Sequence, residues 1–278
     1  RDVERSRGLG DVYKRQIKEW WDNMDSVTLI TRQRRFGKTL TISMLKRFFS
    51  IQYYNESAIF EHLDIWKYPE YREIMGTYPA MERGLMTGIT RVSKESLFSD
   101  FNNMEVVTIT SVKYADVYGF TEDEVFSALD EYGLSDIKDK VKRWYDGFLF
   151  GNSKDIYNPW SIINLLDKKQ LGTYWANTSA NGLIAKLIQE GDRNIKQLFE
   201  TLLKGESIVC EIDEQIIYNQ LSINDNAIWS LLLASGYLTV VNYIGYGDAK
   251  LPENCMPQYE LKITNYETKL MFNELVKN

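Results

Sequence analysis

The sequence predicts an α/β fold, in which a parallel sheet with flanking helices is followed by a mainly helical region that contains a small β-hairpin. Three observations predict this fold. The apolar run Val27–Thr31 fits a buried strand, and residues 38–49 behind it carry apolar side chains at helical spacing. The β-rich runs 237–243 and 258–263 flank a loop of Gly, Pro and Asn that suits a hairpin. Much of the remaining C-terminal half has helical periodicity, over residues 159–167, 181–190, 195–204, 224–234 and 266–276.

Shorter elements are predicted between these regions. Thr121 and Glu124 form a capping box that predicts a helix to about Tyr132. Asn158-Pro159 is typical of a helix start, because proline suits the first helical position. Further helical stretches are expected over residues 17–22, 57–66, 69–75, 93–101 and 135–145, and β-rich runs over residues 84–90, 105–110 and 207–212.

The composition is that of a soluble globular protein. The 278 residues are 44% apolar and 26% charged, and the length suggests about two domains. A net charge of −6 argues against general affinity for nucleic acid, although a local basic patch is compatible with it. Cys210, Cys255 and His62 lack ligand spacing, so the sequence predicts neither a zinc site nor a disulfide framework, and a reducing cytoplasm is the expected compartment. No apolar run reaches the roughly 18 residues of a membrane span.

The turn between the first strand and the first long helix carries the chemistry. It reads Arg-Gln-Arg-Arg-Phe-Gly-Lys-Thr over residues 32–39. A strand, a turn ending in Gly-Lys-Thr and a helix are the context of a phosphate-binding loop, the Walker A motif, because the N–H groups at a helix start can bind an anion. Lys38 would reach the terminal phosphates of ATP, and Thr39 would be the metal ligand that holds Mg²⁺. The predicted cofactor-binding residues are Arg32, Arg34, Arg35, Phe36, Gly37, Lys38, Thr39 and Leu40.

An ordinary helix start with a basic turn is the alternative interpretation. Arg32 stands where this motif usually has its first glycine, and a bare Gly-Lys-Thr is a weak signal. Lys38 favours the phosphate-binding interpretation, because a cation at the positive end of a helix is disfavoured unless an anion is present.

Seven blocks in order along the chain carry a family resemblance. Together they resemble the bacterial AAA-ATPase-like proteins, P-loop ATPases that usually carry a C-terminal PD-(D/E)XK nuclease-like domain. The resemblance implies a P-loop NTPase-like parallel sheet, a mainly helical lid domain, and ATP hydrolysis coupled to the nuclease-like domain. In that family Arg32 is the expected residue, whereas proline is typical at Gln33. The blocks are Leu29-Ile-Thr-Arg-Gln-Arg-Arg-Phe-Gly-Lys-Thr39, Thr87-Gly-Ile-Thr-Arg-Val-Ser-Lys-Glu-Ser96, Trp144-Tyr-Asp-Gly147, Tyr157-Asn-Pro-Trp-Ser161, Tyr174-Trp-Ala-Asn-Thr-Ser179, Leu231-Leu-Leu-Ala-Ser-Gly-Tyr-Leu238 and Tyr259-Glu-Leu-Lys-Ile-Thr-Asn-Tyr-Glu267.

One segment of the family pattern has no counterpart in this chain. A P-loop ATPase normally has a second acidic motif, Walker B, whose Asp holds Mg²⁺ and whose Glu polarises the attacking water. The family places it between a Gly-Thr-Tyr-Pro block and a Gly-Ile-Thr-Arg block, which here lie almost together at residues 76–79 and 88–91. The chain is therefore expected to be internally truncated near Ala80 and Met81, and it is not expected to hydrolyse ATP efficiently.

Other motifs carry residue types that suit catalysis, metal binding or nucleic-acid binding. Thr90 and Arg91 resemble a sensor of the γ-phosphate and, with Lys38, are the predicted catalytic residues; a strand end with a solvated arginine is the alternative. Asp213 and Glu214 are interpreted as a connector between helical elements and, alternatively, as metal-binding carboxylates. Packing in the core and between domains, rather than stacking on nucleic acid, is predicted for the aromatic residues Trp144, Tyr145, Tyr157, Trp160, Tyr174 and Trp175.

Three regions are expected: a disordered leader outside the family over residues 1–16, a truncated P-loop ATPase-like domain over 17–118, and the mainly helical region over 119–278. The nuclease-like domain is expected to be absent. The expected function is ATP binding, with nucleotide as the ligand and a nuclease-like domain or another protein as partner. A non-catalytic interaction scaffold with a vestigial phosphate loop is the alternative. Direct nucleic-acid binding through Arg32, Arg34 and Arg35 is a weaker hypothesis, and no membrane partner is expected.

Overall fold

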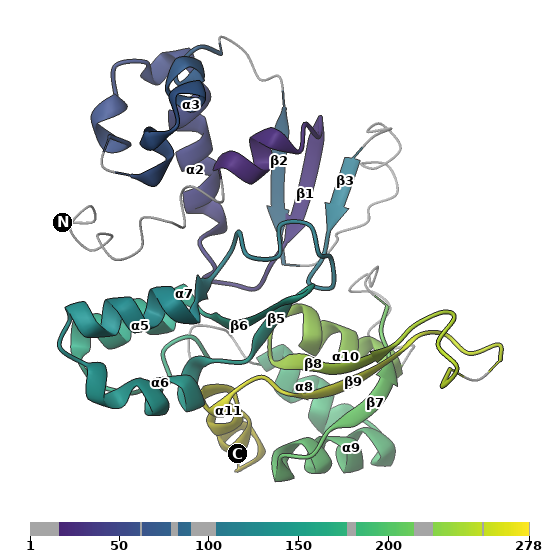
Figure 1. The fold of residues 1–278 in the computed structure, drawn as a ribbon. Coiled ribbons are helices and arrows are strands. Elements are labelled where there is room, and N and C mark those ends of the chain that lie inside the picture. The colour runs from purple at the N-terminus through teal and green to yellow at the C-terminus, as the bar shows by residue number, and fades with distance from the viewer. Residues whose placement is uncertain are drawn as a thin grey trace.

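The computed structural model describes residues 17–61, 63–78, 83–89, 104–176, 182–213, 225–251 and 253–277. Thr90, Arg91, Glu214, the leader and the helix expected over residues 93–101 lie outside this part of the chain. The described residues form an α/β fold with one parallel and two antiparallel three-stranded sheets (Figure 1). The predicted fold class is thereby confirmed as an α/β protein with a parallel sheet.

The parallel sheet holds the predicted first strand at its centre. Its order is β2-β1-β3, with β1 (Val27–Thr31), β2 (Gly84–Gly88) and β3 (Met104–Val107). In Figure 1 the arrows of β2 and β3 point toward the later elements of the chain, and β1 runs parallel to both. The carboxyl ends of the strands therefore face the C-terminal half, and this is the edge where parallel sheets bind ligands.

Helices and short 3₁₀ turns form the rest of the N-terminal part, beside the parallel sheet. Residues 17–22 are helical, and Trp21 from this segment stacks on Phe49 of α2 (Lys38–Phe49) with ring centroids 4.5 Å apart. The predicted helical stretch 57–66 is instead two short 3₁₀ turns, because Phe60 and Leu63 both turn into the core within three residues. These two turns are Ser57–Ile59 and Asp64–Lys67. A third 3₁₀ turn, Ile51–Tyr53, precedes them, and the helix α3 (Pro69–Ile74) follows them.

A second, antiparallel sheet was not predicted. Its order is β4-β6-β5, with β4 (Phe120–Thr121), β5 (Phe148–Phe150) and β6 (Ser153–Tyr157). The capping box is confirmed, since the Thr121 hydroxyl and the Glu124 carboxylate bond each other's backbone N–H groups. Asn158 caps the helix that proline opens, as expected. The helices of this part are α5 (Glu122–Glu131), α6 (Lys138–Tyr145), which follows the 3₁₀ turn Ser135–Ile137, and α7 (Pro159–Lys168).

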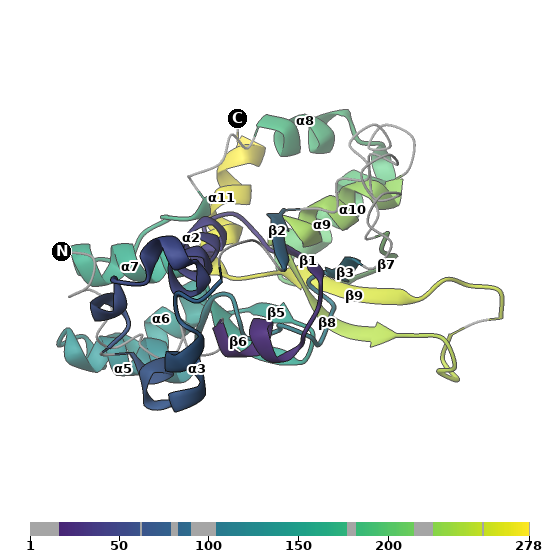
Figure 2. The same cartoon turned by 90° about the horizontal axis from the view of Figure 1, so that it is seen from above.

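The third sheet contains the predicted hairpin, whose strands are antiparallel neighbours. The strand order is β7-β9-β8, with β7 (Ile208–Glu211), β8 (Leu238–Ile244) and β9 (Gln258–Ile263). Residues 208–211 form a strand paired with β9, which confirms the β-rich run expected over residues 207–212. The β8–β9 hairpin projects beyond the neighbouring helices in both views (Figures 1 and 2). The helices here are α8 (Gly182–Glu190), α9 (Arg193–Lys204), α10 (Asp225–Ala234) and α11 (Tyr266–Lys277).

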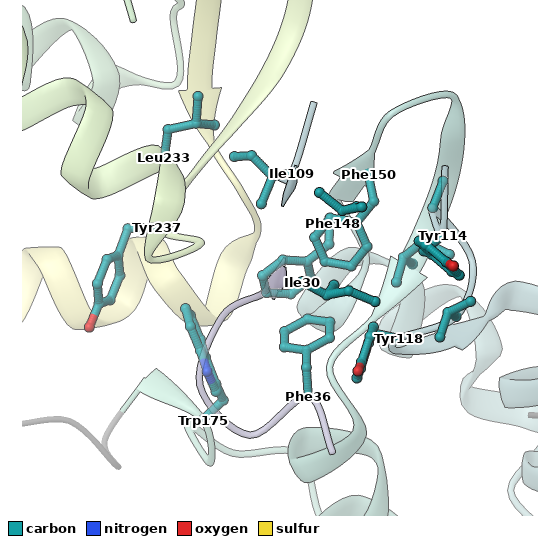
Figure 3. Close-up of a cluster of buried hydrophobic side chains, with 14 of the residues drawn as sticks. Ile30, Phe36, Ile109, Tyr114, Tyr118, Phe148, Phe150, Trp175, Leu233 and Tyr237 are labelled. Atoms are coloured by element: carbon teal, nitrogen blue, oxygen red, sulfur yellow. The ribbon is translucent and has the colours of Figure 1, made fainter. Parts of the chain in front are cut away.

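One buried cluster connects the parallel sheet with the C-terminal half. Figure 3 shows Ile30 of β1, Phe36 of the turn and Phe148 of β5 close together in it. Trp175 continues the cluster toward Tyr237, at 5.3 Å between ring centroids. The carboxyl end of β1 is therefore packed against residues that come much later in the sequence. Within the described residues, no helix has the length and apolar character that crossing a bilayer requires.

Candidate functional site

The candidate site is built on residues 32–37, called here the basic turn, which join the end of β1 to the start of α2. Gly37 has a left-handed backbone, with φ 78° and ψ 8°, at the position just before the helix. A Cβ at Gly37 would meet no atom within 4 Å, so the backbone conformation and not crowding favours glycine there. No side chain caps α2, and its first turn has no acidic residue. Its first N–H groups are therefore available to an anion.

Lys38 folds back over the basic turn. Its Nζ donates hydrogen bonds to the backbone oxygens of Arg32 at 2.9 Å and Gln33 at 2.6 Å. Burial, together with the neighbouring guanidinium groups of Arg34 and Arg32, lowers the pKa of Lys38 to about 8. No carboxylate pairs with Lys38 in the part of the chain that the structure describes. An anion placed beside Lys38 would raise this pKa again.

A cationic cavity of about 360 Å³ opens beside Lys38. Gly88 and Ile89, at the carboxyl end of β2, form one side of it, and Arg34, Arg35 and Lys38 form the other. The volume lies within the usual range of small-ligand sites, about 300–1,000 Å³. The structure thus brings three of the predicted cofactor-binding side chains to one cavity at the expected edge of the sheet.

Thr39 and Leu40, the next two predicted residues, lie on the first turn of α2. Both side chains are exposed, and Leu40 is 61% accessible. Neither is among the residues that line the cavity.

Arg32 has a structural role in place of the ligand-contacting role expected from the sequence. The residue is 0% exposed. Its Nη1 donates to the backbone oxygens of Thr31 and Thr108, and its Nη2 donates to that of Tyr114, each at 2.8 Å. The guanidinium also lies 4.7 Å from the ring centroid of Phe150. Arg32 therefore stabilises the basic turn from inside, because both terminal nitrogens of its guanidinium donate to backbone oxygens.

Phe36 also differs from its expected role at the level of the side chain. Its ring is 1% exposed and meets the rings of Phe148 at 5.0 Å and Phe150 at 5.4 Å in edge-to-face contacts. Figure 3 shows these rings together. Only the backbone of Phe36 can face a ligand, and its side chain joins the basic turn to the second sheet.

Residues from the C-terminal half hold the backbone of the basic turn. The backbone oxygen of Arg34 accepts hydrogen bonds from Trp175 Nε1 at 3.0 Å and from Asn158 Nδ2 at 3.4 Å. The guanidinium of Arg35 lies 4.5 Å from the ring centroid of Trp160. Sequence reasoning assigned Trp160 and Trp175 to packing and missed these contacts with the basic turn. The available signal was that both lie in blocks of the family resemblance, but neither block lies near the turn in sequence.

Residues 14–144 match the family model described as predicted AAA-ATPase. These residues belong to the AAA-ATPase-like family. The AAA-ATPase-like region contains the parallel sheet, the basic turn and α5, and it ends within α6. Asn158, Trp160 and Trp175 lie beyond it.

One further protein is similar over most of the chain. An uncharacterized protein in the vnfD 5′ region of Azotobacter chroococcum mcd 1 is 26% identical over 194 residues, which are 68% of this chain and 33% of that protein. The matched part thus amounts to a third of the length of that relative. No solved structure matches this chain.

Two sets of described acidic residues belong to the second and third sheets. Asp213 follows β7 of the third sheet, and its N–H donates to the Ser230 hydroxyl at 3.0 Å. Glu122, Asp146 and Asp155 bring three carboxylates within 4.8 Å at the edge of the second sheet. Lys142 forms ion pairs with Glu122 and Asp155. Burial and the neighbouring Asp155 raise the pKa of Asp146 to about 7. Lys142 offsets part of the negative charge of this cluster, which adds no acidic group to the parallel sheet.

Proposed function

We propose that this chain binds ATP with Mg²⁺ at the basic turn, used as the Walker A loop of a P-loop NTPase-like sheet. Lys38 is the observation that carries the proposal. It is a half-buried cation at the open N-terminus of a helix, beside a cavity, with backbone oxygens as its partners and with a lowered pKa. Such a group gains a partner when a phosphate arrives. Membership of residues 14–144 in the AAA-ATPase-like family supports a nucleotide as the ligand.

Different groups of the basic turn and of α2 would bind different parts of a triphosphate. Backbone N–H groups at the start of α2, near Gly37 and Leu40, would bind phosphate oxygens. Lys38 would donate to the terminal phosphates, while Arg34 and Arg35 add positive charge at the cavity wall. Thr39, exposed at the helix start, fits the position of the Mg²⁺ ligand because its hydroxyl is not used for capping.

We infer that the chain binds ATP but hydrolyses it slowly. In the described residues that directly follow β1, β2 and β3, no aspartate or glutamate is present to hold the metal or orient water. Hydrolysis coupled to a nuclease-like partner domain would need a carboxylate from another segment or another protein, and Thr90 and Arg91 remain the proposed sensor residues. A non-catalytic scaffold with a vestigial loop is the second proposal, and the absence of ATP binding would favour it.

Titration calorimetry with Mg-ATP tests the proposal. Lys38→Ala should weaken binding by roughly tenfold or more, because it removes a charge-assisted contact. Lys46→Ala is the matched control: it removes a lysine from the opposite end of the same helix, and it should bind as the wild type does. Unchanged affinity in a folded Lys38→Ala variant would refute the Walker A assignment. Nanomolar DNA binding with a steep salt dependence that is lost in an Arg34/Arg35 double variant would favour nucleic acid as the ligand instead.

A further inference from the structure

The AAA-ATPase-like region does not hold its own phosphate-binding loop alone. Three successive backbone oxygens of the basic turn each accept a hydrogen bond. Lys38 occupies those of Arg32 and Gln33, whereas Trp175 and Asn158 occupy that of Arg34. The last two donors come from outside residues 14–144.

The two sets of bonds behave differently when a phosphate is bound. Lys38 uses two of its three ammonium donors on the oxygens of Arg32 and Gln33, so a bound phosphate would take the third donor or replace one of these bonds. The bonds to the Arg34 oxygen can persist, because Trp175 and Asn158 do not line the cavity. Trp175 would therefore keep the peptide between Arg34 and Arg35 oriented even where the Lys38 bonds rearrange. A helix-start anion site depends on this alignment of its N–H groups.

Glu267 forms hydrogen bonds with the segments that carry Trp175 and Asn158, the two donors to the basic turn. It lies in the first turn of α11 and is 1% exposed. Its Oε1 accepts from the backbone N–H groups of Trp175 at 2.6 Å and Ala176 at 3.3 Å. Its Oε2 accepts from the Ser161 hydroxyl at 2.9 Å. The Ser161 N–H in turn donates to Asn158 Oδ1 at 3.3 Å, so both donors to the basic turn are connected to one carboxylate.

Packing fixes the indole ring in the same position. Trp175 is 2% exposed, and its ring lies 5.6 Å from Phe148 in an edge-to-face contact and 5.3 Å from Tyr237. Figure 3 shows Trp175 between Tyr237 and the Phe36 side of the cluster. A ring packed on several sides cannot turn its N–H away without opening the core. The direction of the Nε1–H bond is therefore set by the C-terminal half.

We propose that Trp175 and Glu267 are positioning residues for the basic turn, so that anion binding there is coupled to the packing of the C-terminal region. The coupling to a ligand rests on the proposed phosphate binding at the turn. Coupling between two sites is reciprocal, so a bound nucleotide should also protect the segment around Trp175.

The first test removes a single hydrogen bond. Trp175→Phe keeps an aromatic ring and loses the Nε1–H donor, and the full-length variant should bind Mg-ATP about five- to tenfold more weakly than wild type. Trp229→Phe is the control, because Trp229 is equally buried in the same cluster and forms no bond to the basic turn among the described residues. Equal losses in both variants, or no loss in a folded Trp175→Phe protein, would overturn the proposal.

Hydrogen exchange without nucleotide separates this proposal from the proposed function. The amides of the basic turn should exchange faster in Trp175→Phe than in Trp229→Phe or wild type. This result would support the positioning role even if wild type failed to bind Mg-ATP, a failure that would count against the proposed ligand only. Unchanged exchange at the turn would overturn the positioning role whether or not ATP binds.

A pH comparison tests Glu267. Burial raises the pKa of Glu267 to about 7, against the opposing effect of its hydrogen-bond donors. Ser161 from α7 faces it, and the phenols of Tyr145 and Tyr174 are its titratable neighbours; both phenols have raised pKa values and stay neutral near pH 7. Glu267→Gln copies the protonated form and should match wild type in Mg-ATP affinity at about pH 6.

The same variant should bind about threefold more weakly than wild type at about pH 7.5, where the wild-type carboxylate accepts all its bonds. A constant difference between Glu267→Gln and wild type across this pH range would indicate a merely structural role and overturn the assignment of Glu267. Asp146 also titrates near pH 7, and Asp146→Asn should leave the wild-type pH dependence of binding unchanged.

Discussion

The parallel sheet and the third, antiparallel sheet differ in how burial is distributed over their strands. Every residue of β2, from Gly84 to Gly88, is only partly buried, and among the described strands β2 and β3 each pair with β1 alone. The central strand of each sheet is paired on both sides, but four of the five residues of β1 are buried, whereas Leu261 is the one buried residue of β9. Parallel sheets normally occur with both faces covered and with more strands. The basic turn thus follows the most buried strand of the parallel sheet, and Trp175 and Asn158 from the C-terminal half hold the backbone of the turn.

The largest expected effect concerns ATP turnover, because a complete catalytic site would require a carboxylate at the carboxyl ends of the parallel strands. Without a carboxylate at the described carboxyl ends of the parallel strands, hydrolysis should be slower than in a complete site by about three to five orders of magnitude. A phosphate-release assay on monodisperse protein checks this, with Thr39→Ala as control. Turnover on the order of 1 per second that Thr39→Ala abolishes would show that a carboxylate such as Asp213 or Glu214 completes the site.

A second prediction separates bracing from ligand contact in the basic turn. Arg32→Lys should lower the free energy of unfolding by about 3 kcal/mol, because a buried lysine cannot reach the three backbone oxygens that the guanidinium satisfies. Arg35→Lys is the matched control at an exposed guanidinium and should change stability by less than about 0.5 kcal/mol. Urea unfolding measures both. Equal stabilities would restore Arg32 as a candidate ligand residue.

A third prediction tests how tightly the C-terminal region is closed. Gly147 has φ 118°, and a Cβ there would collide with the backbone oxygen of Thr264, just before α11. Gly147→Ala should therefore destabilise the protein by about 2 kcal/mol or more. Gly133 also has a positive φ, 71°, but open space around it, so Gly133→Ala should cost about 1 kcal/mol. Thermal unfolding followed by circular dichroism distinguishes them, and equal losses would contradict the close approach of α11.

The smallest expected effect is a pH dependence that belongs to the basic turn itself. Burial and neighbouring cations lower the pKa of Lys38 to about 8, so the free turn loses a positive charge as pH rises through 8, whereas a bound phosphate keeps the proton in place. Mg-ATP affinity should fall about tenfold from its plateau by about pH 9. Lys38→Arg, which stays protonated, should lack this fall. The same decrease in Lys38→Arg would assign the titration to another group.

Local patterns predicted the elements that depend on neighbouring residues. The apolar spacing of β1 and α2, the capping box at Thr121 and the β8–β9 hairpin are all confirmed by the structure. The second sheet was missed, because β4 and β5 are only two and three residues long and the pairing of β5 with β6 is irregular. Runs this short have no detectable alternation.

The supports of the site could not be predicted, because they depend on contacts between distant segments. Nothing in the sequence around Arg32 indicates that its guanidinium turns inward, since arginine is usually exposed. The bond from Trp175 to the Arg34 oxygen spans 141 positions in the sequence. Its existence depends on how the third sheet and α11 close over the turn, which no local period encodes.

The contacts of Lys38 with the Arg32 and Gln33 oxygens also have a consequence for selectivity. The Lys38 ammonium group already bonds two backbone oxygens of the turn, so an anion has to compete with these oxygens for it. A monovalent anion such as chloride would offer the ammonium group only a single weak contact, and replacing a backbone hydrogen bond by it would give little gain. A polyphosphate supplies several oxygens to the ammonium and the helix start at the same time. The basic turn should therefore sort anions by their valence and their number of oxygens before any base or sugar is recognised.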